Sequence, residues 1–134
     1  MPDDSAGTVL VADDEAMLLS LVDSVLRRAG FQVVTAATGA EALEAFREDP
    51  AAIDAVLIDA GIPPEGAVET LRSMLALRGG IGVVVSSGAS PSDELQELLA
   101  SCGGRFLRKP FEPEDLISAV SAVGRSGADS PWPR

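Results

Sequence analysis

Short apolar segments alternate with longer amphipathic segments along most of this chain. Short apolar runs bounded by polar residues are typical of buried strands, and apolar residues at helical spacing are typical of helices that cover a sheet. Strict alternation of the two favours a parallel sheet, because each helix returns the chain to the edge where the previous strand began. The sequence therefore predicts an α/β fold with five strands and helices on both faces of the sheet.

Turn and capping residues set the expected limits of these elements. The strands are expected at residues 8–12, 31–35, 54–58, 82–86 and 105–108. Acids and prolines favour the first turn of a helix, and serine or threonine favours the position before it. Helix starts are accordingly expected at Asp13-Asp14-Glu15, at Thr38 with Glu41 as a capping box, at Ser90-Pro91, and at Pro113.

The size and composition fit one domain. A chain of 134 residues can bury one core, and we expect a domain over residues 8–123 with flexible ends at 1–7 and 124–134. No apolar stretch reaches the roughly 18 residues of a membrane span, and no secretory signal is visible. The single cysteine, Cys102, excludes an internal disulfide and is expected to fill space near a helix end, since no histidine can activate it. A cytoplasmic location is the resulting expectation.

The charge balance is strongly acidic, with 21 acids, 10 bases and a net charge of −11. Nucleic-acid binding needs a basic surface that displaces counterions from phosphates. The bases Arg105, Arg108 and Lys109 cluster modestly, but they alternate along an expected strand and so are not expected to share one face. Neither nucleic acid nor a membrane is an expected partner.

Polar residues that could bind a ligand or take part in a reaction lie at the carboxyl ends of the expected strands. Asp13 and Asp14 follow the first strand, and Asp59 follows the third. Ser87 follows the fourth strand, and Lys109, the only lysine, follows the fifth. In a parallel sheet these ends meet at one edge, where open α/β folds bind their ligands. Three carboxylates beside one ammonium suit a divalent cation and a phosphoryl group.

Four motifs at these strand ends resemble the receiver domains of bacterial response regulators, and the resemblance covers about residues 8–123. The motifs are Val9-Leu10-Val11-Ala12-Asp13-Asp14-Glu15, Val56-Leu57-Ile58-Asp59 with Pro63 at the fourth following position, Val83-Val84-Val85-Ser86-Ser87-Gly88, and Phe106-Leu107-Arg108-Lys109-Pro110-Phe111. Each motif alone is weak, but four in the right order form a strong signal. The resemblance implies a flavodoxin-like, CheY-like fold with strand order 2-1-3-4-5, and a part in two-component signalling.

The resemblance also implies a phosphoacceptor and a metal site. Asp59 would accept a phosphoryl group from a phosphohistidine. Mg²⁺, with Mn²⁺ as a substitute, would be bound directly by Asp14, Asp59 and the backbone carbonyl of Gly61. Asp13 would act largely through a metal-bound water. A hard dication suits this set because it relieves the repulsion of close carboxylates.

A second implied group contacts the phosphoryl oxygens and responds to them. Lys109 and Ser87 would bind these oxygens, and Phe106 would turn inward into the space that Ser87 vacates. The other implied members are Ala60, Gly88 and a cis peptide bond between Lys109 and Pro110.

The loop after Asp59 departs from the pattern of the family. Residues 60–66 read Ala-Gly-Ile-Pro-Pro-Glu-Gly, one residue shorter than is usual, with Ile62 at the place of a methionine. Gly61 supplies no side chain at a position that often adjusts how water reaches the phosphoryl group. Metal binding through a carbonyl is retained, whereas the lifetime of the phosphoryl group is left open.

The leading functional hypothesis is a stand-alone receiver, phosphorylated by a sensor histidine kinase or a phosphotransfer protein. Its output would be protein binding through the face of the fourth helix, fifth strand and fifth helix, with Arg105, Leu95 and Leu116 among its residues. A homodimer on activation is left open. No enzymatic turnover is expected beyond self-catalysed phosphoryl transfer and autodephosphorylation.

Two other functions stay open at this stage. A degenerate receiver would bind its partner constitutively. A small phosphatase of the haloacid dehalogenase type would also use an aspartate nucleophile with Mg²⁺ and a lysine. That enzyme needs a second acid two residues after the nucleophile, where this chain has Gly61.

Overall fold

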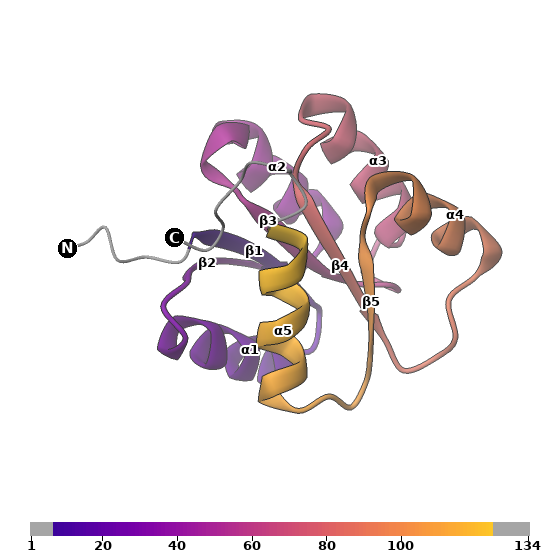
Figure 1. Ribbon diagram of the computed structural model, residues 1–134. Helices are drawn as coiled ribbons and strands as arrows, with labels where there is room; N and C mark the ends of the chain where they lie inside the picture. The colour runs from indigo at the N-terminus through magenta and orange to yellow at the C-terminus, as the bar shows by residue number, and fades with distance from the viewer. Residues whose placement is uncertain (1–6, 125–134) are drawn as a thin grey trace.

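The computed structural model describes residues 7–124, so the expectations for the two ends of the chain lie outside the described residues. Five parallel strands form one sheet in the order β2-β1-β3-β4-β5 (Figure 1). The predicted fold class and strand order are therefore confirmed. In chain order the elements are β1 Thr8–Ala12, α1 Ala16–Arg28, β2 Gln32–Ala36, α2 Gly39–Glu48, the 3₁₀ helix η2 Pro50–Ala52, β3 Ala55–Asp59, α3 Ala67–Leu77, β4 Gly82–Ser87, α4 Asp93–Cys102, β5 Arg105–Arg108 and α5 Pro113–Gly124.

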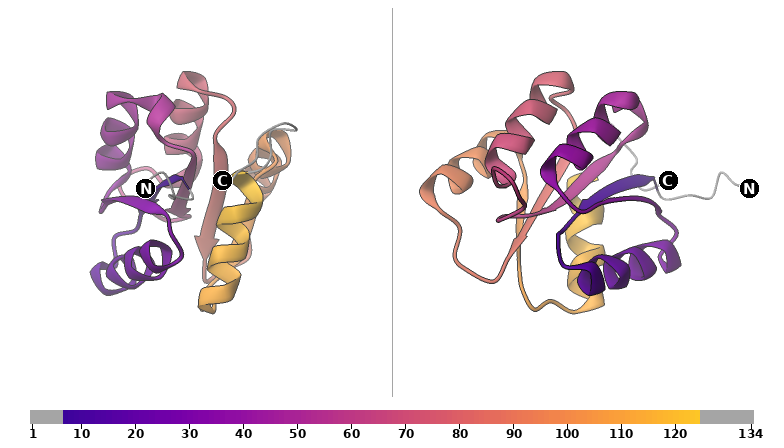
Figure 2. Two further views of the ribbon diagram at one scale, coloured as in Figure 1. Left: turned by 60° about the vertical axis from the view of Figure 1, so that its left-hand side comes forward. Right: turned by 180° about the vertical axis from the view of Figure 1, so that it is seen from behind.

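Helices cover both faces of the sheet and divide the core into two clusters (Figure 2). Successive strand residues point to opposite faces, so Val56 and Ile58 of β3 belong to one cluster while Ala55 and Leu57 belong to the other. The first cluster packs under α2, α3 and α4, and the second packs under α1 and α5. We call these the α2–α4 layer and the α1–α5 layer.

The helices are attached to the sheet to different extents. Of the residues of α4, only two leucines are buried, Leu95 and Leu99. The α5 helix buries four residues, Leu116, Ala119, Val120 and Val123.

Gly82, at the start of β4, explains why α5 lies so close to the sheet. A Cβ atom at this position would lie 2.8 Å from the carbonyl oxygen of Val123. Only glycine therefore fits between β4 and α5 without moving the helix.

Several strand limits differ by one residue from the expectation. The β2 and β3 strands begin and end one residue later than expected, and β4 extends one residue further, to Ser87. Asp59 is consequently the last residue of β3 rather than the first after it. The short 3₁₀ helix at Pro50–Ala52 was not expected.

Two of the expected helix starts are wrong. The α1 helix begins at Ala16 with no acid in its first turn, because Asp13 lies at the strand end, where its Oδ1 accepts a hydrogen bond from the Glu15 amide. The α4 helix is capped by Ser92, whose Oγ accepts from the Leu95 amide at 3.1 Å, and not by Ser90. The helix begins at Asp93, and the acids of its first turn complement the positive end of the helix dipole.

The other two helix starts are confirmed. Thr38 Oγ1 accepts from the Glu41 amide at 3.1 Å, and the Glu41 carboxylate accepts in return from the amide of Ala37. The α5 helix begins at Pro113.

Cys102 ends α4, where it is half-buried against the α2–α4 layer. Burial raises the pKa of its thiol, although backbone hydrogen bonds at Gly104 and at Cys102 itself act in the opposite direction. This placement agrees with the expected space-filling role. No helix within residues 7–124 is long and apolar enough to cross a membrane.

Candidate functional site

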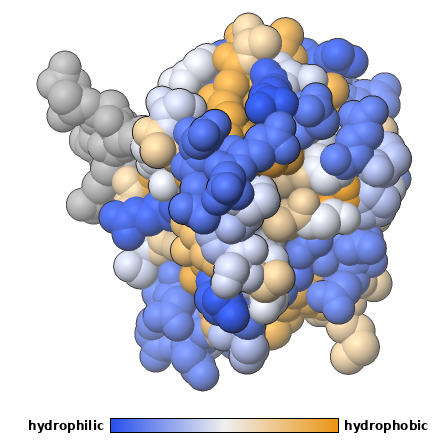
Figure 3. Space-filling model, turned by 90° about the vertical axis from the view of Figure 1, so that its right-hand side faces the viewer, coloured by the Kyte–Doolittle hydropathy of each residue, from blue (hydrophilic) through white to orange (hydrophobic). Residues whose placement is uncertain are grey.

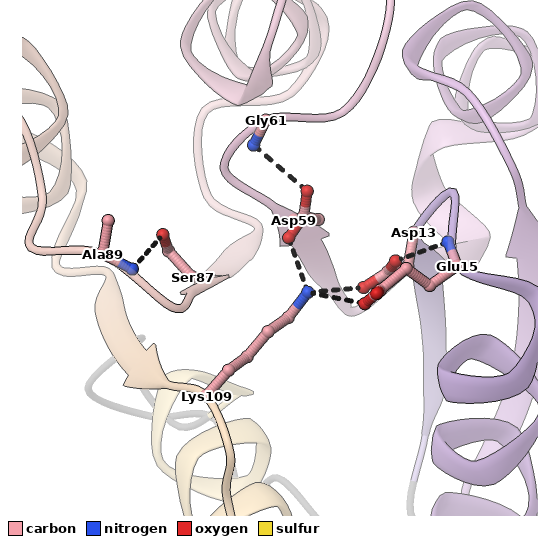
Figure 4. A network of polar contacts seen from close by, with 7 residues as sticks. All are labelled: Asp13, Glu15, Asp59, Gly61, Ser87, Ala89 and Lys109. Atoms are coloured by element: carbon pink, nitrogen blue, oxygen red, sulfur yellow. Dashed lines mark hydrogen bonds and ion pairs between the residues drawn. The ribbon is translucent and has the colours of Figure 1, made fainter.

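The carboxyl edge of the sheet brings Asp13, Asp59 and Lys109 together (Figure 4). Asp59 ends β3, whereas Asp13 follows β1 directly and Lys109 follows β5 directly. The backbone continues the sheet at these places, since the Lys109 amide donates to the Ser87 carbonyl at 2.9 Å. The Asp13 amide likewise donates to the Ala36 carbonyl at 3.1 Å. Strand register thus fixes the positions from which these side chains converge.

The Lys109 ammonium is the centre of the cluster. Its Nζ lies 2.7 Å from Oδ1 of Asp59 and 3.1 Å from Oδ2 of Asp13. A third carboxylate, that of Glu15, lies 3.6 Å from the same nitrogen. The side chains of Lys109, Asp13 and Asp59 are 18%, 8% and 17% exposed, respectively, whereas that of Glu15 is 66% exposed.

The protonated form of Lys109 is stabilised by its neighbours. Burial by itself would lower the pKa of this amine, but hydrogen bonds and charge interactions with Asp59 and Asp13 raise it above its ordinary value of 10.5. Lys109 is therefore a fixed positive charge at neutral pH.

The second oxygen of Asp59 faces the loop that follows β3. The Gly61 amide donates to Oδ2 of Asp59 at 3.1 Å. A Cβ atom on Gly61 would lie 3.7 Å from this oxygen, so any side chain at position 61 would stand against the carboxylate. The Gly61 carbonyl accepts no hydrogen bond from residues 7–124. It is free to act as a ligand.

The other residues expected at the site lie around this cluster. Ser87 forms no hydrogen bond with Asp59; its Oγ accepts from the Ala89 amide at 3.0 Å, as Figure 4 shows. Phe106 is half-buried and packs against the α2–α4 layer. A Cβ atom on Gly88 would meet nothing within 4 Å.

Backbone geometry accounts for the remaining predicted members. The Ala60 amide donates to the Ser86 carbonyl at 2.8 Å, which continues the pairing of β3 with β4 one residue beyond Asp59. The Lys109–Pro110 peptide bond is cis, as is the Pro63–Pro64 bond, for which there was no expectation.

Carboxylate and carbonyl oxygens are the ligands that Mg²⁺ prefers, so the donor atoms at this edge suit that ion. Within residues 7–124, however, no three acidic side chains stand close enough together to hold a metal ion. Asp14 is exposed and forms no hydrogen bond or ion pair with the described residues, and Lys109 lies between Asp13 and Asp59. The residues therefore fit the ion by type.

Glu15 is the member of the cluster that the sequence analysis missed. From the sequence it is expected at the start of a helix and in the first receiver motif, with no contact to Lys109. The available signal was its place directly after Asp13 and Asp14, at the end of the same strand.

Comparison with known proteins identifies similar sequences over most of the chain. Residues 9–121 match the model of the response regulator receiver domain family. The transcriptional regulatory protein KdpE of Mycobacterium tuberculosis is 33% identical over 117 residues, which are 87% of this chain and 50% of that protein. The chain thus spans about half the length of the curated relatives it matches.

Solved structures agree with the sequence comparison. A response regulator receiver domain protein from Clostridium thermocellum has a TM-score of 0.83 at 27% identity and covers 89% of this chain and 94% of its own. A response regulator receiver protein from Sinorhizobium medicae has a TM-score of 0.77 at 34% identity, with 90% and 95% covered.

Proposed function

Because this chain belongs to the response regulator receiver domain family, we propose that Asp59 accepts a phosphoryl group and that the modified domain binds a protein partner. Members of the family act mainly as phosphoacceptor signalling modules of two-component systems, and they interact with histidine kinases and downstream partners. The assignment of Asp59, and the roles of the residues around it, are the finer part of the proposal.

The observation that carries the proposal is the environment of the Asp59 carboxylate. It ends a buried strand, remains partly open to solvent, and lies 2.7 Å from a lysine ammonium. In the transfer, a carboxylate oxygen attacks the phosphorus of a phosphohistidine. The new O–P bond forms as the P–N bond breaks, and the imidazole leaves with the bonding electron pair and takes up a proton. Lys109 then stabilises the phosphoryl oxygens as a charged donor.

The metal that receivers generally need for phosphorylation would be held by residues already described. Asp14, Asp59 and the free carbonyl of Gly61 would bind Mg²⁺ directly, and Asp13 would bind it through water. When bound, the ion neutralises charge on the phosphoryl oxygens. Because Gly61 has no side chain, no side chain at position 61 shields Oδ2 of Asp59 from water.

Ser87 and Phe106 are the proposed response elements. The Ser87 hydroxyl accepts from the Ala89 amide but keeps its own proton available for a phosphoryl oxygen. Its movement toward Asp59 would release the loop that leads into α4. Phe106 packs in the same α2–α4 layer and would follow that movement.

An apolar groove beside the site is the proposed docking place of the phosphodonor protein. The groove has a volume of about 750 Å³ and lies between α1 and the segment after β5. Met17 and Leu21 of α1 are 88% and 57% exposed, although both are large and apolar. The groove also reaches Lys109, so a protein seated in it has its histidine near Asp59. Its lining residues are Glu15, Met17, Leu18, Leu21, Lys109, Pro110 and Phe111.

The proposed output face needs a correction. Leu95 and Leu116 are 4% and 1% exposed, because both lie on the core-facing sides of their helices, so they are not part of a binding surface. Arg105 is exposed, and it borders a groove of about 400 Å³ together with Arg108. The two arginines stand three residues apart on β5, so their side chains point to opposite sides of this edge strand, as expected. Figure 3 looks onto the side of the molecule that carries β5 and α4, where apolar patches lie between hydrophilic side chains.

The phosphoacceptor is tested by intact mass after incubation with acetyl phosphate and Mg²⁺. The protein should gain the mass of one phosphoryl group, and Asp59→Asn should gain none. Asp49→Asn, at an exposed aspartate after α2, serves as the matched control and should behave as the unsubstituted protein. Normal uptake by Asp59→Asn would refute the assignment. No uptake by any variant would favour the degenerate receiver that binds its partner constitutively.

The docking groove is tested by a charge placed on its wall. Leu21→Glu should lower the rate of transfer from a histidine-phosphorylated donor protein by about tenfold or more, since buried apolar contacts of this size are worth about 1.5–3 kcal/mol. Its rate with acetyl phosphate should not change. Leu77→Glu, at an exposed leucine on α3, is the control that should leave both rates unchanged. Equal loss in the two variants would show that the groove is not the docking place.

A further inference from the structure

Glu15 is the member of the Lys109 cluster to which the proposed function gives no role. Its carboxylate oxygen lies 3.6 Å from Nζ of Lys109. Glu15 is also the residue before α1, but its side chain forms no capping hydrogen bond. Within residues 7–124, the ion pair with Lys109 is thus the only polar interaction of this side chain.

The three acids surround the ammonium group unevenly. An ammonium has three N–H donors, and here three carboxylates lie around it, those of Asp59, Asp13 and Glu15. Asp13 and Glu15 stand on the α1 side of Asp59, whereas Ser87 stands on the opposite side (Figure 4). Asp13 and Glu15 would therefore compete with phosphoryl oxygens on Asp59 for the Lys109 ammonium.

We propose that Glu15 is a positioning residue that holds Lys109 on the α1 side of the site and so restrains phosphorylation by small donors. Glu15 also lines the apolar groove. A protein seated in that groove therefore contacts Glu15 and releases Lys109 from it, which a small donor such as acetyl phosphate does not do. The restraint on phosphorylation rests on the proposed function, whereas the hold on Lys109 is independent of it.

Lys109 is the only lysine of the chain, which makes the hold directly measurable. Acylation by N-hydroxysuccinimidyl acetate, an uncharged reagent, can be followed at Lys109 by peptide mapping without any metal. The α-amino group of the chain provides the internal reference. Glu15→Gln should raise the rate at Lys109 about two- to fivefold, the range expected for an exposed ion pair. The difference should become smaller in 1 M NaCl, where the Debye length falls to about 3 Å.

Glu44→Gln is the matched control, because Glu44 is exposed on α2 and forms no ion pair with residues 7–124. It should leave the acylation rate unchanged. An equal acylation rate in Glu15→Gln and Glu44→Gln would overturn the proposal.

The second measurement is the rate of phosphoryl uptake from acetyl phosphate with Mg²⁺ for the same variants. Glu15→Gln should raise the maximal rate about two- to fivefold at saturating donor. If Glu15→Gln changes only the acetyl phosphate concentration that gives half the maximal rate, and not the maximal rate itself, then Glu15 merely repels the anionic donor. That result would overturn the proposed restraint. If no variant takes up phosphoryl, the proposed function fails, while the acylation rates still decide whether Glu15 holds Lys109.

Discussion

At the scale of single residues, Lys109 titrates in a pH range where few other groups of this chain change their charge. The chain has no tyrosine and no other lysine, and arginines stay charged up to about pH 12. The folded state raises the pKa of Lys109, so its contribution to stability is complete below the ordinary value and is lost as the pH rises through the folded value. Cys102 acts in the same direction at lower pH, because its thiol pKa is also raised.

The pH dependence of stability is therefore measured in a Cys102→Ala variant, which removes the contribution of the thiol. The free energy of unfolding should fall between about pH 10 and 12, and the fall should be smaller when Lys109→Met is added. Urea unfolding followed by circular dichroism measures both curves. If the two curves stay parallel over this range, Lys109 is not stabilised by its acidic neighbours.

The same scale shows what the sequence could and could not predict about the site. Strand periodicity together with the family motifs places Asp13, Asp59 and Lys109 at one edge, and the structure brings these three into contact. Which acids reach the ammonium depends on side-chain directions that no local pattern encodes. Asp14 forms no hydrogen bond or ion pair with the described residues, while Glu15, one residue further along, contacts Lys109. The chemical roles of all these residues stay predictions.

At the scale of elements, the packing of α5 on β4 depends on the absence of a side chain at Gly82. A methyl group there would meet the Val123 backbone, so Gly82→Ala should lower the free energy of unfolding by about 1–3 kcal/mol, as overpacking usually does. Gly80→Ala, where a Cβ would meet nothing within 4 Å, should change it by less than about 1 kcal/mol. Urea denaturation of both variants gives the comparison. Similar losses in the two would mean that α5 can move away from β4 freely.

The helix starts show the limit of local patterns at this scale. Ser90 and Ser92 both fit a capping position, and Pro91 favours a start at the first of them. The acids Asp93 and Glu94 favour Ser92 as the capping residue, because they then occupy the first turn of α4. At α1 the acid Asp13 is used by Lys109, 96 residues away in sequence, so no local pattern could exclude it from the helix.

At the scale of the whole molecule, a bound cation should stabilise the fold, because its proposed ligands come from two segments, after β1 and at the end of β3, that meet only in the folded chain. At ten times its Kd, a ligand that binds only the folded state adds about 1.4 kcal/mol to the free energy of unfolding. Tm should therefore be higher in MgCl₂ than in NaCl of equal ionic strength. Asp14→Asn should lose this difference and Asp49→Asn should keep it, as measured by differential scanning calorimetry. An equal difference in both variants would mean that Mg²⁺ acts elsewhere.

The division of the core has a consequence for how such a domain can diversify. The α5 helix buries four residues and sits against Gly82, so changes on its inner side alter the stability of the whole chain. The α4 helix fully buries only Leu95 and Leu99, with Leu98 and Cys102 partly buried beside them. Its outer side can thus accept new side chains, and so acquire new binding preferences, with little effect on folding. Selection on stability should therefore act mainly on α5, whereas the outer side of α4 is free to vary.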